Sequence, residues 1–323
     1  MNTLTFPLFL FLMALVLGCG SGPAPAVEEG SQRAAVRFEE EAPEVEGRVL
    51  FTLPWGEGAG ALGMEDVGGR PGPMGFAVDR AGRVVVADSI NGRVVRYSPS
   101  GDLLDTMELG DTLPEFVSLS SLGEIHVLVY DSLEVAYRVL RFDEAGRLLE
   151  EMDVPVPLPT GIFAVGSRSL VESRHAHVYE VSGEDRRIAG DRLDPHALGR
   201  PDRSGSGLFW SAVKEGVAVR IQAKQRDGGQ RHSFVLEPHN GLVSLFFLDT
   251  DGEGNVYVGL YTQGGAEVAV VAPRGELLGR LRLSPTRYAS SKQFVAVGEA
   301  GQVVEMRTHE NGVTFVELDW RRP

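Results

Sequence analysis

Four histidines are the side chains of this sequence best suited to metal chemistry. His175 and His177 stand two residues apart in "HAH", and strand side chains repeat every two residues, so both would lie on one strand face. His196, in "DPHALG", and His239, in "EPHNG", fall in expected connections between structural units, so all four could approach one mouth of a channel and hold zinc. Scattered surface histidines are the default in a chain with seven of them, and we therefore assign no metal ligand.

Asp79 and Asp249 are carboxylates at expected strand ends. A calcium-dependent hydrolase needs several acidic and amide side chains that point into one channel beside a general base. The segments expected to line the channel carry almost no other carboxylate: they read "GFAVD", "FVSLS", "IFAVG", "FWSAV" and "FVAVG". No "GxSxG" elbow occurs either. The sequence therefore predicts an apolar, packed channel, with no catalytic residue and no cofactor assigned.

Two glycine-rich segments suggest ligand loops on first inspection. "WGEGAGALG", residues 55–63, continues as "MEDVGGRPGPMG", which cannot start the helix that a phosphate-binding loop requires. We interpret it as the link from the last structural unit to the first. "DTDGEGN", residues 249–255, resembles the start of a calcium loop, but its twelfth position is Leu260 where an EF-hand has Glu. A tight turn between two strands explains it as well.

A repeat of about 40 to 50 residues organises the chain. The pattern of a turn glycine followed two residues later by Val or Ile recurs at Gly82, Gly123, Gly254 and Gly301, with weaker copies at Ser169 and Gly216. A second marker, Gly followed by one polar residue and two leucines, recurs at Gly101, Gly146 and Gly275. Each unit reads as four short strands, here called A to D, and no segment has a convincing helical period.

Four-stranded units of this length predict an all-β, six-bladed β-propeller with antiparallel blades. The last unit lacks a fourth strand, whereas residues 47–54, "GRVLFTLP", carry the strand D pattern. We expect residues 47–54 to complete the last blade, which would close the ring and remove two sheet edges. The propeller would span 47–323, with blades at about 73–109, 115–154, 161–193, 207–237, 243–283 and 291–320.

The first unit, "VVVADSINGRVVRYSPSGDLL", resembles an NHL-repeat blade. In that family an Asp ends strand B, an Asn-Gly turn leads to an Arg that starts strand C, and a Gly opens strand D. The matching positions are Asp88, Asn91, Gly92, Arg93 and Gly101. The match is clearest in the first unit and weakest in the third and fourth. The resemblance implies an NHL-repeat or TolB-like propeller.

The N-terminus is typical of an exported, lipid-anchored protein. Residues 1–18 are uncharged and apolar, as in a signal peptide, and are too short to span a bilayer comfortably. Cys19, the only cysteine, follows in "LVLGCGSG", which resembles a bacterial lipobox. We predict lipidation at Cys19, hence a membrane contact, and Gly20 in place of Asp favours the outer membrane. With Cys19 modified, no thiol is left for a disulfide or a thiolate metal site.

The distribution of charge predicts the character of the remaining N-terminal segment and the class of partner. Residues 20–46 hold seven Glu and two Arg, so we expect 19–46 to be a flexible acidic tether. The net charge of −14 argues against nucleic acid, because phosphate neutralisation needs clustered cations.

We therefore expect a binding module of the cell envelope that docks a protein, peptide or glycan on the face of the B–C turns and D–A links. The candidate loops are 55–74, 130–136, 194–207, 222–231, 260–266 and 284–292. The alternative hypothesis is a calcium- or zinc-dependent hydrolase or lyase that resembles six-bladed lactonases. A purely structural envelope module is the third.

Overall fold

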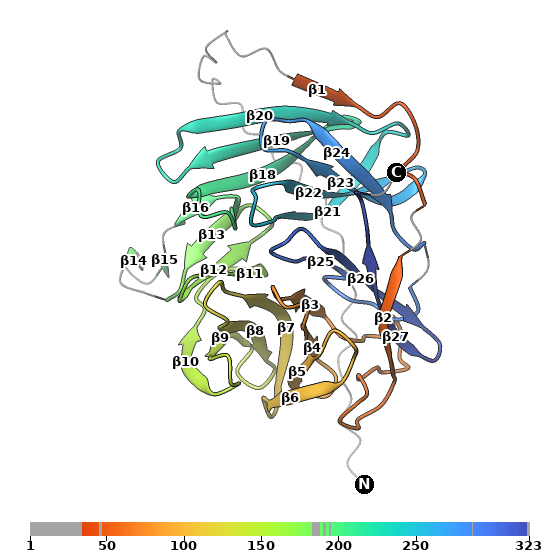
Figure 1. Ribbon diagram of the computed structural model, residues 1–323. Coiled ribbons are helices and arrows are strands. Elements are labelled where there is room, and N and C mark those ends of the chain that lie inside the picture. The colour runs from red at the N-terminus through yellow and green to blue at the C-terminus, as the bar shows by residue number, and fades with distance from the viewer. Residues whose placement is uncertain are drawn as a thin grey trace. The chain divides into compact units, whose positions relative to one another are not determined.

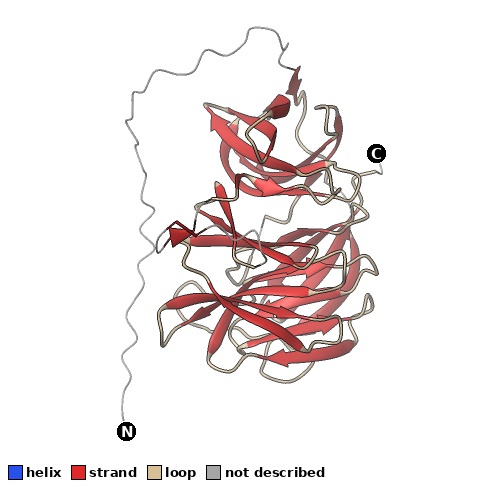
Figure 2. Cartoon of the chain, turned by 90° about the vertical axis from the view of Figure 1, so that its left-hand side faces the viewer, coloured by secondary structure: helices blue, strands red, loops and turns tan. Residues whose placement is uncertain are grey.

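The computed structural model describes residues 34–44, 47–182, 188–189, 192–193, 195–285 and 287–321. Residues 1–18, expected to be a signal peptide, and Cys19 lie outside these residues. The described residues form strands, turns and loops without a helix (Figure 2). Accordingly, they include no helical segment with the length and apolar character that a membrane crossing requires.

Six antiparallel sheets form the blades of a β-propeller (Figure 1), which confirms the expected fold class. Blade 1 is β3 (Gly75–Val78), β4 (Val84–Asp88), β5 (Arg93–Tyr97) and β6 (Leu103–Glu108). Blade 2 is β7 (Thr112–Leu119), β8 (Ile125–Asp131), β9 (Ala136–Phe142) and β10 (Leu148–Asp153). Blade 3 is β11 (Pro159–Val165), β12 (Arg168–Ser173), β13 (His177–Glu180) and β16 (Ala197–Leu198).

Blade 4 is β17 (Arg200–Pro201), β18 (Leu208–Glu215), β19 (Ala218–Gln225) and β20 (Gln230–Glu237). Blade 5 is β21 (Leu242–Thr250), β22 (Val256–Thr262), β23 (Gly265–Val271) and β24 (Leu277–Arg282). Blade 6 is β25 (Val295–Val297), β26 (Val303–His309), β27 (Gly312–Leu318) and β2 (Arg48–Pro54). A separate ribbon pairs β14 (Ile188–Ala189) with β15 (Arg192–Leu193).

The hydrophobic core lies in the seams between neighbouring blades. Each of the six core clusters draws its side chains from two consecutive blades around the ring. A middle strand therefore buries both of its faces, and this explains why β4 reads "VVVAD" with every residue buried. The smallest of these clusters lies between blades 3 and 4, where the repeat pattern is weakest in sequence.

Ring closure occurs as expected, through residues 47–54. β2 pairs antiparallel with β27, so the first strand of the ring completes the blade formed by the last three (Figure 1). Phe51 of β2 packs on Phe315 of β27 and Tyr97 of blade 1, with ring centroids 4.9 and 5.7 Å apart. Gly101 has a φ of 88°, and a Cβ there would lie 2.5 Å from Phe51. Gly101, the glycine that precedes the two leucines, is thus required for two reasons: its backbone has a positive φ, and Phe51 of the closing strand leaves no room for a Cβ.

The NHL-like positions of blade 1 hold the link that follows the closing strand. Arg93 and Asp88 form a buried ion pair with Nε and Oδ2 2.9 Å apart. The Arg93 guanidinium also donates to the carbonyls of Glu57, Gly58 and Ala61, while Asp88 accepts the amide of Gly63. Residues 55–63 therefore form the link between blades 6 and 1, and the Asp88–Arg93 pair fixes it.

The antiparallel strand order gives the propeller two distinct faces. A–B and C–D turns lie at one end of the strands, which we call the AB face. B–C turns and the links between blades lie at the other end, which we call the BC face. Every loop is assigned to a face by its place in the blade.

Blade 4 differs from the sequence interpretation. "FWSAV" was expected to be an inner strand A, but it lies in β18, the second strand, and the short β17 is innermost. The blade therefore begins at Arg200 rather than 207, and Gly216 lies in a B–C turn. Loops 202–207 and 226–229 fall on the AB face, opposite to the expected docking face. A turn glycine before Val occurs at both ends of a blade, so the local pattern could not distinguish them.

The expected tether is in part a structured segment of the propeller. β1 (Ala34–Arg37) pairs parallel with β20 and adds a fifth strand to blade 4 (Figure 1). Phe38 is 2% exposed and joins the seam between blades 4 and 5. The guanidinium of Arg280 stacks over the Phe38 ring at 4.5 Å and donates to the carbonyl of Glu40 at 2.7 Å. Glu41 pairs with Arg282. Glu44 lies 3.7 Å from the same guanidinium, so Arg282 of β24 matches two acidic side chains of this segment.

We expect Arg93→Ala to lower the free energy of unfolding by about 3–5 kcal/mol, because it leaves the Asp88 carboxylate buried without its cation. Chemical denaturation at pH 7 measures the change. The matched control is Arg37→Ala, whose exposed pair with Glu237 contributes under about 1 kcal/mol. Equal losses in the two variants would contradict a structural role for Asp88–Arg93.

Phe38→Ala should cost about 3 kcal/mol of unfolding free energy, since it removes a buried ring from the seam between blades 4 and 5. The exposed neighbour Glu39→Ala serves as control and should change the denaturation midpoint little. If both variants unfold like the parent chain, Phe38 does not contribute to the seam between blades 4 and 5.

Candidate functional site

The four candidate histidines do not come together. His175 has a φ of 55° and lies in the turn before β13, so it does not share a strand with His177, and both are exposed. His196 is buried, with Nδ1 3.0 Å from the Glu180 carboxylate. His239 lies exposed in the link after β20. Across the described residues, no three His, Cys, Asp or Glu side chains are grouped so as to hold a metal ion.

The axis of the propeller is polar where the sequence predicted an apolar channel. Arg203 donates to Asp249 at 2.7 Å and to the carbonyl of Val297 at 2.6 Å. Arg200 pairs with Glu172 at 2.8 Å and donates to the carbonyl of Leu248 at 2.6 Å. The prediction was wrong because both arginines come from the misassigned start of blade 4. Their sequence signal is "LGRPDRSGSG", within the loop singled out for recognition.

Burial raises the pKa of the carboxylates on the axis, whereas the neighbouring arginines lower it. Burial raises the pKa of Asp249, although Arg203 opposes the shift. Burial would also raise the pKa of Glu172, but the charges and hydrogen bonds of Arg200 and His175 bring it down to about 2. Glu172 is thus held ionised and paired, as in a structural ion pair that joins blade 3 to blade 4.

A His–Ser–Glu array that the sequence analysis missed lies between blades 2 and 3. Nδ1 of His126 is 2.7 Å from the Ser169 hydroxyl, and Nε2 is 3.4 Å from the Glu124 carboxylate. The residue types resemble a hydrolase triad, but His126 and Ser169 are fully buried, and a nucleophile must reach its substrate. Burial, assisted by Arg141, lowers the pKa of His126 to about 4. The array is therefore a neutral hydrogen-bonded link between β8 and β12.

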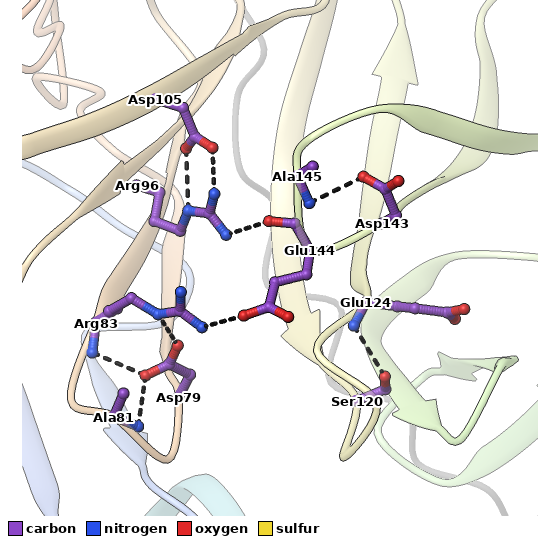
Figure 3. A network of polar contacts seen from close by, with 10 residues as sticks. All are labelled: Asp79, Ala81, Arg83, Arg96, Asp105, Ser120, Glu124, Asp143, Glu144 and Ala145. Atoms are coloured by element: carbon purple, nitrogen blue, oxygen red, sulfur yellow. Dashed lines mark hydrogen bonds and ion pairs between the residues drawn. The ribbon is translucent and has the colours of Figure 1, made fainter.

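A cavity of about 320 Å³ opens on the AB face at the axis. Blades 1 to 4 supply nearly all of its wall, and Glu299 of blade 6 completes it. Asp79, one of the carboxylates singled out in the sequence, lies at this cavity and accepts the amides of Ala81 and Arg83. Asp79 therefore stabilises the first A–B turn and pairs with Arg83 (Figure 3).

The BC face carries exposed apolar side chains and strained backbone. We call six of these residues the apolar arc: Leu133, Val135, Leu158, Leu198, Val217 and Val243. The non-glycine residues recorded with positive φ in the described chain all lie in B–C turns or links between blades: Arg70, Val135, Leu158, Arg174 and His175. Positive φ in a β-branched residue is a true outlier, and such strain concentrates at functional sites. Two members of the arc, Val135 and Leu158, are both strained and exposed.

Comparisons with known proteins support the fold alone. No protein-family model and no curated protein matches the sequence. Among solved structures, the PQQ-bound aldose sugar dehydrogenase of Streptomyces coelicolor is 11% identical, with 86% of this chain and 99% of that chain covered and a TM-score of 0.52. Regucalcin of Agrobacterium tumefaciens is 13% identical, with 88% and 96% covered and a TM-score of 0.43. Virginiamycin B lyase of Staphylococcus aureus is 14% identical, with 76% and 94% covered and a TM-score of 0.45.

His126 predicts an acid-dependent loss of stability. Its pKa is about 4 when folded against an ordinary 6.5, so the unfolded chain binds the proton more readily between these values. Stability contributed by neutral His126 is complete above pH 6.5 and falls by up to roughly 3 kcal/mol as the pH drops to about 4. We expect His126→Gln, which keeps a polar partner for Ser169, to show a shallower decline over this range.

Unfolding free energies measured from pH 4 to 8 test this, with the exposed His177→Gln as control. The control should follow the parent curve. Parallel curves for the parent and His126→Gln would show that the burial of His126 does not govern the decline.

Proposed function

We propose that this chain is a lipid-anchored binding module of the bacterial cell envelope, exported through residues 1–18, attached at Cys19 and placed in the outer membrane. An NHL-repeat or TolB-like propeller would be its binding domain. The blade 1 match to the NHL pattern supports the assignment, since Asp88, Asn91 and Arg93 form one hydrogen-bonded group there. The tether would be the chain between Cys19 and the structured segment that starts at Ala34.

The observation that carries the proposal is the apolar arc. Leu133 is 78% exposed and Val135 74%, both in the B–C turn of blade 2, and Val217 is 70% exposed in the B–C turn of blade 4 on the same face. The arc lies on backbone that the blades hold rigidly: the amide of Leu242 donates to the carbonyl of Val217, and that of Arg174 to Leu158. Exposed apolar side chains on a preformed rigid face mark an interaction site.

The chemistry of the partner follows from the charges at the blade 2 end of the arc. Asp111, Glu134 and Asp153 are exposed next to its blade 2 end. Asp131 and Glu134 share Arg138, so that cation is already neutralised within the protein. The chain as a whole carries a net charge of −14. A protein with an apolar patch rimmed by Lys and Arg is the complementary partner.

A binding role explains the sites better than metal-dependent hydrolysis does. His175, His177, His196 and His239 lie in separate environments, and the axial carboxylates are committed to arginines. The strained residues, by contrast, gather on the BC face.

Site-specific photo-crosslinking in the source bacterium tests the docking face. A benzoylphenylalanine placed at Leu133 or Val217 of the full chain should give one discrete adduct, because both positions would face the same partner. Leu122, 64% exposed on the AB face, is the matched control and should give none. Asp111→Lys combined with Asp153→Lys should reduce the Leu133 adduct about tenfold, through loss of charge complementarity.

Adducts of equal yield at Leu133 and Leu122 would contradict the docking face, and an adduct that survives the charge reversal would contradict the basic partner. The anchor is checked in the same cells. Cys19→Ser should move the chain out of the membrane fraction, and an unchanged distribution would refute lipid attachment.

A further inference from the structure

The cavity on the AB face has the size and enclosure of a small-molecule site. Its volume of about 320 Å³ falls at the lower end of the range for ligand pockets. It lies on the face opposite to the apolar arc, and its wall comes mainly from A strands and A–B turns, with Val85, Arg96 and Ile125 added from B and C strands. The interaction proposed above does not use it.

Its walls are held by charged contacts that leave the mouth preformed. Arg83 joins Asp79 of its own turn to Glu144 of blade 2 (Figure 3). Arg96 pairs with Asp105 and donates to the carbonyl of Glu144 at 2.7 Å. These contacts fix blade 1 against blade 2 along one side of the cavity, so a ligand would meet an already ordered wall.

The cavity is lined by hydrogen-bond donors whose protons are not accepted by any of the described residues. The buried Ser118 hydroxyl accepts the amide of Ala164 at 3.0 Å, and the buried Ser120 hydroxyl accepts those of Leu122 and Glu124. No bond is recorded in the described chain in which either hydroxyl donates its proton. The guanidinium of Arg80, at the mouth, likewise has no recorded hydrogen bond or ion pair to the described residues. Two hydroxyl protons and a cation together suit a carboxylate.

The other residues that line the cavity indicate the polarity and the charge of the ligand. Phe163, Val165, Leu119 and Val78 give part of the wall an apolar character that would favour a hydrocarbon body. Glu299 stands on the blade 6 side and has no recorded side-chain partner among the described residues. Its charge would repel a second carboxylate, so a monoanion is favoured over a dianion.

We propose that the AB-face cavity binds a small monocarboxylate with an apolar body. The carboxylate lies between Arg80 and the hydroxyls of Ser118 and Ser120, and the hydrocarbon part packs against Phe163 and Val165.

Calorimetric titration of the purified full chain with 3-phenylpropanoate tests the proposal. 3-Phenylpropanol, 3-phenylpropylamine and phenylsuccinate serve as the neutral, cationic and dianionic comparisons. The monocarboxylate should bind at least about tenfold more tightly than each of them, because charge-assisted hydrogen bonds form only with it. Equal or tighter binding of the amine would overturn the proposal.

Variants locate the binding. Arg80→Gln should weaken 3-phenylpropanoate binding about tenfold, and Ala164→Leu, which fills the cavity, should weaken it at least as much. Arg274→Gln is the matched control, since Arg274 is an exposed arginine on a C–D turn of the same face outside the cavity. Binding unchanged by Arg80→Gln, or equally weakened by Arg274→Gln, would refute the site. Thermal unfolding of each variant verifies that the fold is intact.

Discussion

Closure of the ring is the constraint on which the rest of this structure depends. Each seam is built from two blades, so an incomplete sixth blade would leave both of its neighbours with exposed apolar faces. β2 closes it by antiparallel pairing with β27, and Phe51 fills the seam against Tyr97 and Phe315. The chain must then pass from the outer strand of blade 6 to the inner strand of blade 1. The Asp88–Arg93 pair holds that link by binding its carbonyls and an amide. The same ion pair that joins two strands of blade 1 thus stabilises the closure of the ring.

Blade 4 shows how the fold tolerates a degenerate repeat. Its inner strand is only Arg200–Pro201, too short to fill the axis with apolar side chains. Arg200 and Arg203 instead reach across to carbonyls and carboxylates of blades 3, 5 and 6, so that the polar axis is satisfied internally. On the outer side, β1 and Phe38 extend the blade and cover its seam with blade 5. The loss of pattern at the centre is thus balanced by contacts from distant parts of the chain.

The two faces of the propeller have different physical character. The AB face is built from turns whose carboxylates and hydroxyls cap the backbone, as Asp79 and Ser120 do, and it encloses the axial cavity. The BC face carries exposed leucines and valines, of which Val135 and Leu158 have strained backbone. Antiparallel blades keep both faces rigid, because every turn is held by paired strands. Such a scaffold can present two independent sites without a conformational change.

The sequence by itself determined most of the strands, the number of blades and the closing strand, because strand alternation and turn glycines are local properties of the backbone. It also predicted correctly that residues 55–63 connect two blades. Only the tertiary structure decided that Gly216 turns at the BC face, that residues 34–37 add a strand to blade 4 and that Phe38 joins the core. It also decided that Arg200 and Arg203 cross the axis while His175, His177, His196 and His239 lie apart. A turn glycine reports a backbone conformation without saying which face it lies on, and a long side chain finds its partner only once distant strands are side by side. The local pattern therefore fixed the repeating frame, and packing between blades fixed the sites.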